Sequence, residues 1–244
     1  VDNLMFDKTI HTTLAFVHTF PDGDRDFSFY RNPGADMSLT PEEVKEDLIA
    51  SSRIFHFGTL SMTHEGVREA TKKALKCAKE NGCTITFDPN LRKPLWASLD
   101  EAKEQFAYGM EFCDVLKISD NEIQWFTDKE DYDEGIKVIQ DKYNIPLILL
   151  SMGKAGSRAY YKDMRVIGKP YIQENTIDTT GAGDTFCACC LNAVLEKGLD
   201  NFSAEDLEEM LSFANAAASL ITTRKGALRV MPTKEDILAL QKCL

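Results

Sequence analysis

The stretch DTTGAGDTF (178–186) leads directly into the apolar, helix-forming run FCACCLNAVLE (186–196). Glycines at a helix start allow bare backbone to approach a ligand closely. The free amides of a first helical turn and the helix dipole attract an anion. The stretch therefore indicates an anion-binding turn with Asp184 at its edge. The competing interpretation is a helix terminus whose glycines serve tight packing and whose Asp184 is a first-turn acid.

Upstream of this turn, short apolar runs alternate with helical stretches, which is typical of an α/β fold with a mainly parallel sheet covered on both faces. Strands are predicted at 53–57, 84–88, 114–118 and 146–151, with a hairpin over 157–168. Helices are predicted near 64–80, 98–112, 120–126, 132–143, 183–196, 204–222 and 233–242. A further helix is expected to open at 40–43, where an N-cap residue, a proline and two acids follow one another.

Two aromatic-rich runs near the start of the chain, 12–20 and 25–31, flank an Asp22-Gly23 turn and predict a β-hairpin. In the second run Phe27 and Phe29 share one face. An isolated hairpin is marginally stable in water. We therefore expect these strands to pair with strands that precede the chain or with the same hairpin of another subunit.

Composition limits the classes of function. The 244 residues include 28 basic and 39 acidic side chains, for a net charge of −11. Such a chain is a poor general binder of nucleic acid or anionic membranes. No apolar run approaches the ~20 residues of a membrane span. These features predict a cytoplasmic globular protein without nucleic-acid or membrane partners.

The seven cysteines are an odd number and do not form a disulfide pattern, which favours a reducing compartment. Cys187, Cys189 and Cys190 are expected to pack within a helix; the alternative is a metal site. His56, inside an apolar strand, is expected to pack in the core.

Motifs of several other enzyme classes are missing. The sequence has no G-x-x-x-x-G-K-[ST], and Gly181 and Gly183 have no third glycine in register for a dinucleotide fingerprint. Neither H-E-x-x-H nor G-x-S-x-G occurs. These absences exclude a P-loop enzyme and weigh against a nicotinamide-dependent dehydrogenase.

Several segments together resemble one family. They are FDPNLR with a following LW (87–96), KISDNE (117–122), SMGKAGS (151–157), DTTGAGDTF (178–186), and FANAAA with TRKGA (213–227). In this order they resemble the ribokinase-like (pfkB) carbohydrate kinases, most closely the fructokinase branch, although Ser119 stands where Asn is frequent. The resemblance implies a three-layer α/β domain over 1–244, with lid strands at about 12–32. The family's N-terminal part, with its sugar-binding glycine motif, has no counterpart in the chain.

The resemblance also implies roles for individual residues. Gly181, Ala182 and Gly183 would form the anion hole, and Asp184 would contact the sugar hydroxyl and act as general base. Arg31, on the lid, would bind the sugar, although an exposed strand charge is the alternative. Arg92 would bind the transferring phosphate or a substrate oxygen, with a surface ion pair as the alternative.

The remaining implied roles concern nucleotide and cations. The expected nucleotide-binding residues are Ser151, Gly153, Gly156, Asn215 and Gly226. Glu122 would organise Mg²⁺ through water, unless it is only a first-turn acid. Asp178 and Thr180, with Gly226, resemble a monovalent-cation site suited to K⁺. Asn215 is alternatively a polar group satisfied inside a helix.

The function implied is phosphorylation of a primary hydroxyl of a sugar by ATP and Mg²⁺, with fructose as first choice. The alternative substrate is 2-keto-3-deoxygluconate. A non-catalytic binder of sugar or nucleotide with the same fold is a different class of function. Apart from sugar and ATP, the expected partner is a second copy of the chain, bound through the lid.

Overall fold

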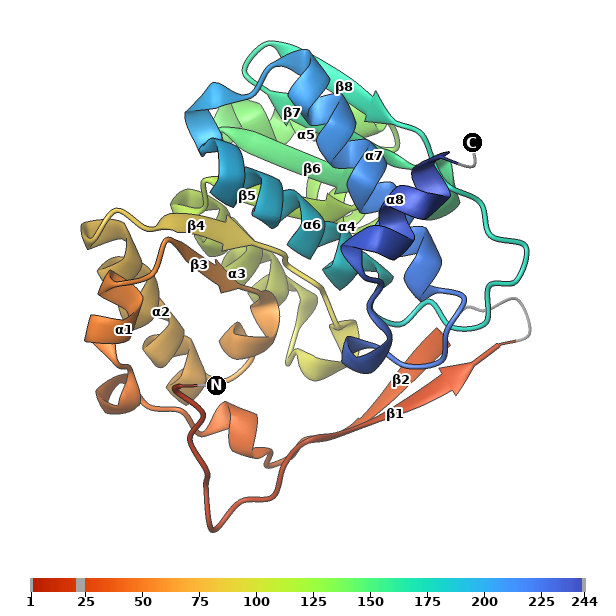
Figure 1. Cartoon of the computed structure of the whole chain (residues 1–244). Coiled ribbons are helices and arrows are strands. Elements are labelled where there is room, and N and C mark those ends of the chain that lie inside the picture. The colour runs from red at the N-terminus through yellow and green to blue at the C-terminus, as the bar shows by residue number, and fades with distance from the viewer. Residues whose placement is uncertain (1, 21–24, 243–244) are drawn as a thin grey trace. The chain divides into compact units, whose positions relative to one another are not determined.

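The computed structural model describes residues 2–20 and 25–242 (Figure 1). The chain divides into two compact units. The first unit comprises 1–16 and 28–145, and the second comprises 17–27 and 146–244. Each unit is an α/β assembly with its own strands, helices and buried side chains, and each is described in turn.

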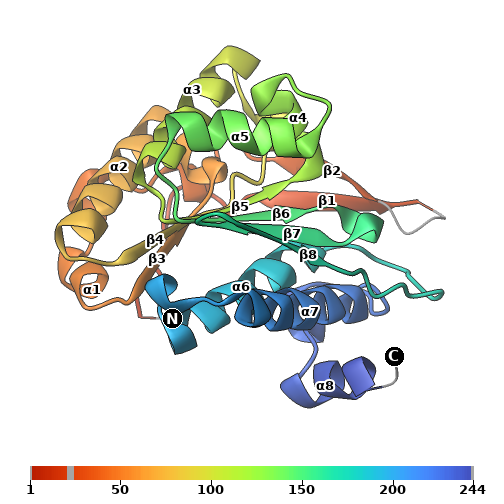
Figure 2. The ribbon, with the colours of Figure 1, turned by 90° about the horizontal axis from the view of Figure 1, so that it is seen from above.

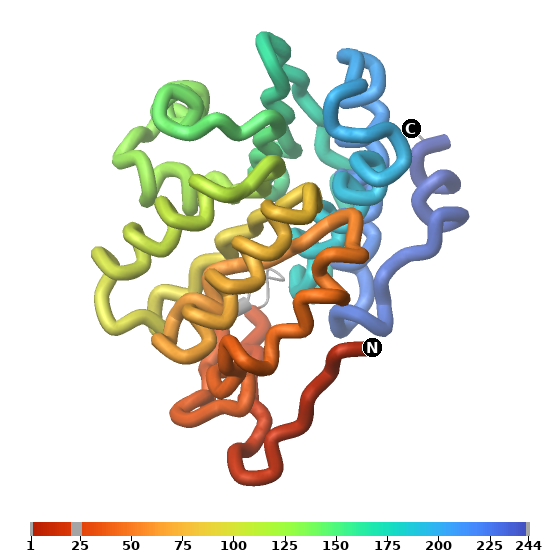
Figure 3. The backbone as a smooth tube through the Cα atoms, turned by 90° about the vertical axis from the view of Figure 1, so that its left-hand side faces the viewer, coloured from red at the N-terminus to blue at the C-terminus, as the bar shows by residue number. Residues whose placement is uncertain are grey.

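The first unit contains three parallel strands, β3 (Ile54–Phe57), β4 (Thr84–Phe87) and β5 (Val115–Ser119). β4 pairs with β3 and with β5, with Phe57 opposite Phe87 and Phe87 opposite Leu116. The helices of this unit are α1 (Glu46–Ala50), α2 (Glu65–Glu80), α3 (Leu99–Phe112), α4 (Asp120–Thr127) and α5 (Tyr132–Lys142). Figure 3 shows α1 and α2 packed beside each other in orange and gold.

The second unit contains an antiparallel meander of β6 (Leu147–Ser151), β7 (Ser157–Tyr161) and β8 (Met164–Gly168). Its helices are α6 (Ala182–Lys197), α7 (Ala204–Ile221) and α8 (Lys234–Lys242). Figure 2 shows α7 running along β7 and β8, with α6 beside it. β6 is apolar, and four of its residues, Leu147, Ile148, Leu149 and Leu150, are fully buried.

The predicted strands 53–57 to 157–168 and the predicted helices after residue 63 are confirmed, with ends that agree to within one residue. The helix expected to open at Thr40 is wrong in extent. Thr40 and Glu43 form a capping box, but Val44 is extended and ends a single 3₁₀ turn, Pro41–Glu43. Helix α1 begins separately at Glu46, so the capping signal marked a turn and not a helix.

The strands β1 (Leu14–Thr19) and β2 (Arg25–Tyr30), in the segment predicted to be a lid, form a two-stranded sheet of their own. The predicted alternation on β2 is confirmed, because Phe27 and Phe29 are half-buried whereas Tyr30 is exposed. The predicted Asp22-Gly23 turn lies outside the described residues. No helix in the described ranges is both long and apolar enough to cross a membrane.

The prediction for His56 is wrong. Strand alternation turns His56 to the face opposite Phe57, and its ring is exposed, with Nδ1 2.8 Å from the hydroxyl of Thr86 on β4. Phe57 is buried instead and stacks on Phe87, with ring centroids 4.5 Å apart. Phe55 and Phe57 therefore share one face of β3, whereas Ile54 and His56 share the other.

An aromatic cluster forms the core of the first unit. The Phe87 ring meets the edge of Phe106 at 6.1 Å, and Phe106 in turn meets Trp125 at 5.2 Å. Gly109 of α3 allows this packing, because a Cβ built there lies 2.5 Å from the Phe87 ring. The absence of a side chain at 109 thus sets how closely α3 approaches β4.

We expect Gly109→Ala to lower the free energy of unfolding by about 1–3 kcal/mol, since the added methyl must displace the Phe87 ring. Urea denaturation measures this change. Gly66→Ala on α2 is the matched control, because its Cβ meets nothing nearer than 3.8 Å. It should be neutral or stabilising by up to about 1 kcal/mol. Equal losses in both variants would contradict the packing argument.

Candidate active site

The glycine turn before α6 has the local structure that its sequence predicts. Gly181 is the N-cap and adopts a left-handed conformation, with φ of 79°. A Cβ at Gly181 would also lie 3.3 Å from Ile221 and 3.4 Å from Ala227, which packs the turn closely against the end of α7 and the following loop. Any other residue would be strained in this backbone conformation.

The first turn of α6 presents backbone donors. The amide of Ala182 donates to the Thr179 carbonyl at 3.2 Å, and the amide of Thr185 donates to the Gly181 carbonyl at 2.8 Å. Helix geometry leaves the amides of Gly183 and Asp184 without an intrahelical acceptor. Together with the positive end of the helix dipole, these two amides are suited to an anion.

Asp184 lies in this first turn and is exposed. Within the described residues, no donor holds its carboxylate. Both the dipole and the neighbouring amides favour a negative charge at this position. An exposed carboxylate at a helix start is therefore accessible to a ligand.

Asp178 ties the glycine turn to the loop after α7. One carboxylate oxygen accepts from the Thr180 amide at 2.9 Å, and the other accepts from the Gly226 amide at 3.0 Å. Asp178 is buried, and its own amide donates to the Thr222 carbonyl at 3.1 Å. The structure therefore brings together Asp178, Thr180 and Gly226, as the sequence predicts.

Two hydroxyls near this turn have no protein partner. The Oγ1 atoms of Thr180 and Thr185 are buried and lack a hydrogen-bond partner within the described part of the chain. A buried hydroxyl without a partner loses the hydrogen bonds that water would make. An oxygen ligand to a bound cation is one way to satisfy such an atom, so Thr180 fits a monovalent-cation site.

The glycine turn after β6 is a separate feature of the second unit. A 3₁₀ turn, Gly153–Ala155, follows shortly after Ser151. The Met152 amide donates to the Gly156 carbonyl at 2.9 Å across this turn. Gly156 has a φ of 90°, and a Cβ there would clash with the Gly168 carbonyl. Gly153 has a φ of 52° and faces open space, so its backbone is accessible to a ligand.

Asn215, on α7, is buried and connects this helix with the segment after β8. Its side-chain amide donates to the Lys169 carbonyl at 3.0 Å. Gly168 packs between Ser157 and Asn215, since a Cβ there would lie 2.6 Å and 2.7 Å from their side-chain atoms. Asn215 thus stands beside the Gly156 turn and holds it in place, while its role toward a nucleotide stays a prediction.

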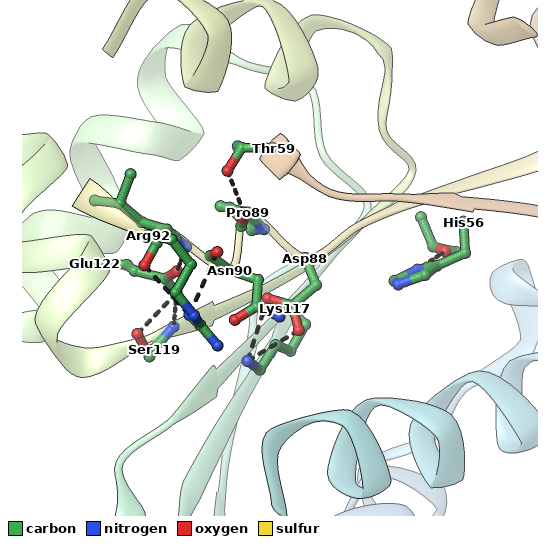
Figure 4. Close-up of polar contacts among 11 residues, drawn as sticks. His56, Thr59, Asp88, Pro89, Asn90, Arg92, Lys117, Ser119 and Glu122 are labelled. Carbon is green, nitrogen blue, oxygen red and sulfur yellow. Dashed lines mark hydrogen bonds and ion pairs between the residues drawn. The ribbon is translucent and has the colours of Figure 1, made fainter. Parts of the chain in front are cut away.

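In the first unit, the loop after β4 carries Arg92 and is fastened by Glu122 (Figure 4). One oxygen of Glu122 accepts from the Leu91 amide at 2.8 Å. Its other oxygen accepts from the amide and hydroxyl of Ser119, at 2.9 and 2.7 Å, within the capping box of α4. Glu122 therefore serves two structural tasks, and one further lone pair remains on the oxygen that faces Leu91.

Arg92 is half-buried on the same loop. Its Nη1 donates to the carbonyls of Asn90 and Leu91 at 3.4 and 3.3 Å, so the head group folds back over its own backbone. The structure thus brings Glu122 of α4 to the loop that carries Arg92, at the carboxyl end of β4. In α/β proteins this end of the strands is where ligands bind.

Arg31 is placed differently from the exposed position considered for it. It is buried and donates from Nε to Asp36 at 2.8 Å, from Nη1 to Thr63 at 2.8 Å, and from Nη2 to the Leu60 carbonyl at 2.9 Å. These contacts fix the end of β2 to the 3₁₀ turn Thr59–Met62. A role of Arg31 toward the sugar stays a prediction.

The sequence analysis missed two contacts at the carboxyl end of β4. Lys117, on β5, forms a buried ion pair with Asp88, and Thr59 donates to the Pro89 carbonyl. A lysine inside the apolar run DVLKI was the available signal, because a buried lysine needs an anionic partner.

The cysteines behave as packing residues. Cys187 and Cys190 are buried on α6, and burial raises the pKa of Cys189 to about 11. Across the described ranges, no three His, Cys, Asp or Glu side chains are grouped so that they could hold a metal ion.

The comparisons with known proteins agree with these features. Residues 1–234 match the model of the pfkB family carbohydrate kinases. The chain is 40% identical over 242 residues to fructokinase-2 of Solanum habrochaites, covering 99% of this chain and 73% of that protein. It is also 40% identical over 245 residues to fructokinase-2 of Solanum lycopersicum, with the same coverage of 99% and 73%.

Solved structures give the same result. A fructokinase from Xylella fastidiosa with bound ATP superposes with a TM-score of 0.84 at 26% identity, over 97% of this chain and 75% of that one. A fructokinase from Vibrio cholerae O395, in a form with fructose, ADP and calcium ion, has a TM-score of 0.84 at 27% identity, over 96% and 75%. The chain belongs to the pfkB family of carbohydrate kinases, and its α/β fold is ribokinase-like, as the sequence motifs imply.

We expect Asp178→Asn to lower the free energy of unfolding by about 1–3 kcal/mol, because an amide nitrogen would face one of the two backbone N–H donors. Thermal denaturation measures the loss, and hydrogen exchange should become faster at the Gly226 loop. Asp163→Asn, in the exposed turn between β7 and β8, is the control and should change stability by less than about 0.5 kcal/mol. Unchanged exchange at Gly226 in Asp178→Asn would contradict the linking role.

Proposed function

We propose that the protein is an ATP-dependent fructokinase, which transfers the γ-phosphoryl group of ATP to the primary hydroxyl of fructose to give fructose 6-phosphate. The observation that carries this proposal is the free carboxylate of Asp184, exposed in a helix first turn that begins at the left-handed Gly181. The fructokinases that share 40% identity with nearly the whole chain support the sugar.

Asp184 is the general base in this proposal. The sugar hydroxyl donates a hydrogen bond to its carboxylate and loses the proton as the oxygen attacks phosphorus. The exposure of Asp184 lets substrate reach it. After transfer, the proton leaves with solvent and the base is restored.

The backbone amides at 183 and 184 bind the charge that develops on the transferring group. They are fixed by α6, so they need no reorganisation during the reaction. Arg92 supplies a further positive charge for the phosphate, consistent with its position at the carboxyl end of β4.

ATP is bound by the second unit's turns in this proposal. The accessible backbone at Gly153, the tight Gly156, and the Gly226 loop held by Asp178 are suited to nucleotide phosphates and adenine, with Ser151 and Asn215 bordering them. The Xylella fastidiosa relative, which was solved with ATP, supports this assignment.

Two cations complete the proposal. Glu122 retains a lone pair beside Leu91 and would hold Mg²⁺ through water, and Mg²⁺ neutralises phosphate charge when bound. Asp178 and the unsatisfied hydroxyl of Thr180 would hold K⁺. Titrating each metal into the protein with ATP, and following nucleotide affinity, tests both assignments independently of turnover.

The test of the proposed function is ADP formation by the complete protein with separate sugars. Fructose should give the highest kcat/KM, and 2-keto-3-deoxygluconate a much lower one. Nucleotide binding without turnover on any sugar would instead identify a non-catalytic binder. We propose that this activity takes place in the cytoplasm, where ATP and free sugars occur together.

Asp184→Asn should lower kcat by about 10²–10⁴, because the nearly isosteric amide cannot accept the proton. Nucleotide affinity should change little, since the backbone amides stay in place. Steady-state kinetics and calorimetric titration of ATP measure the two effects. Glu196→Gln, at the far end of α6, is the control and should keep wild-type kcat. A wild-type kcat in Asp184→Asn would refute the role of general base.

We also propose a homodimer formed through the lid. β1 is exposed along its whole length and carries Leu14 and Phe16, which are 51% and 55% exposed. Contact with the lid of a second copy would cover them. Phe16→Lys should shift the mass measured by light scattering from dimer to monomer, whereas Lys8→Glu, on the exposed segment before β1, should leave it unchanged. A monomeric wild type would refute this proposal.

A further inference from the structure

The strands β4 and β5 are joined at their carboxyl ends by a buried ion pair. The ammonium of Lys117 lies 3.2 and 3.1 Å from the two carboxylate oxygens of Asp88. The two side chains are only 8% and 5% exposed. Figure 4 shows the pair directly beside the loop that carries Arg92.

A gain in folding stability does not explain why this ion pair is buried. Removing two charges from water costs several kcal/mol, and packed apolar residues often do as well or better. At the amino ends, the same two strands are joined without a buried lysine, because Asp114 accepts from the Ile85 amide at 2.7 Å. The ion pair therefore stands only at the strand ends where ligands bind in this class of fold.

Asp88 begins a loop that is fastened at nearly every backbone position. The Asp88 amide donates to the Phe57 carbonyl at 3.1 Å, which continues the β3–β4 pairing. The Pro89 carbonyl accepts from both the amide and the hydroxyl of Thr59, at 3.0 and 2.6 Å. The Leu91 amide donates to Glu122 at 2.8 Å. Asn90, between these fixed points, adopts a left-handed backbone with φ of 47°.

The close approach of β3 strengthens this arrangement. A Cβ at Gly58 would lie 2.6 Å from the Asp88 carbonyl, so only glycine permits the contact. β3, β5 and α4 thus each hold the loop. Among the contacts described above, the charged contact to Asp88, the first side chain of the loop, comes from Lys117. The direction in which the loop leaves β4, and hence the position of Arg92, depends on where Asp88 is held.

We propose that Lys117 is a positioning residue for phosphoryl transfer, which acts through Asp88 to hold the 88–92 loop so that Arg92 meets the phosphate. This inference rests on the proposed kinase function and on Arg92 as a phosphate ligand. Neither Lys117 nor Asp88 touches the reacting atoms. A displacement of about 1 Å at a positioned group is enough to cost about 100-fold in rate.

The test uses the complete protein and two variants. Lys117→Met keeps the side-chain length but removes the ammonium beside the buried Asp88 carboxylate, so both the melting temperature and kcat should fall, kcat by about 10–100-fold. Lys117→Met/Asp88→Asn removes both charges and should regain most of the melting temperature. Its kcat should stay at least about 10-fold low, with KM for sugar near the wild-type value.

Two further measurements separate positioning from general weakening of the fold. Hydrogen exchange at the Leu91 amide should become faster in both variants, because the loop is no longer held at Asp88. Asp114→Ala, which removes the side-chain hydrogen bond to the Ile85 amide at the opposite ends of the strands, should keep kcat within about twofold of the wild type, well short of the loss expected from a displaced loop.

The outcomes are distinct. Wild-type kcat in the double variant, together with a restored melting temperature, would overturn the inference and leave the pair a purely structural one. An equal loss of kcat in Asp114→Ala would overturn it as well. If the wild-type protein binds ATP but phosphorylates no sugar, the proposed function fails, and the exchange measurement at Leu91 still tests whether Lys117 holds the loop.

Discussion

The carboxyl end of β4 is the point on which the first unit's candidate residues depend. The chain must leave a buried strand there, turn through the left-handed Asn90, and reach Arg92 within a few residues. Backbone groups that leave a sheet lose their ladder partners and must find others. Thr59 and Glu122 supply those partners from neighbouring elements, and Lys117 supplies the charge that Asp88 needs.

In the second unit, a glycine allows the chain to turn into a helix. At the start of α6 a left-handed Gly181 turns the chain so that helical amides are left free, and Asp178 satisfies the two loop amides that would otherwise compete for a ligand. Asp178 is buried and holds the loop, whereas Asp184 lies exposed in the first turn of α6, so Asp184 is the acid that a ligand can reach.

Much of the fold could be predicted because its signals are local. Short apolar runs located the strands, and in the structure Ser98 and Ser203 cap two helices at the predicted starts. The helix predicted to begin at Thr40 does not form, although its capping box is present, because the backbone of Val44 is extended. A cap satisfies amides at a helix start and does not supply the apolar face that extends a helix.

The glycine turn and helix start at 178–186 were predictable because one continuous segment forms them. Contacts that join segments far apart in sequence were not predictable. Two partners of Arg31, Thr63 and Leu60, are some 30 residues away, and so is the partner of Lys117. No local pattern records which carbonyl or carboxylate a long side chain will meet, so the exposed-strand alternative for Arg31 looked as good as any other.

Ser119 shows how the structure accommodates a residue that differs from the family pattern. It stands where Asn is frequent, and both residue types are good N-caps because a short side chain reaches the free amides of the first turn. In this chain the Ser119 hydroxyl and amide both donate to one oxygen of Glu122, which leaves the other oxygen to Leu91. The exchange therefore keeps the α4 cap and also fixes how Glu122 faces the loop. Because one carboxylate starts a helix and fastens the loop of Arg92, a change at Ser119 would act on both, and its effect on catalysis would pass through Glu122.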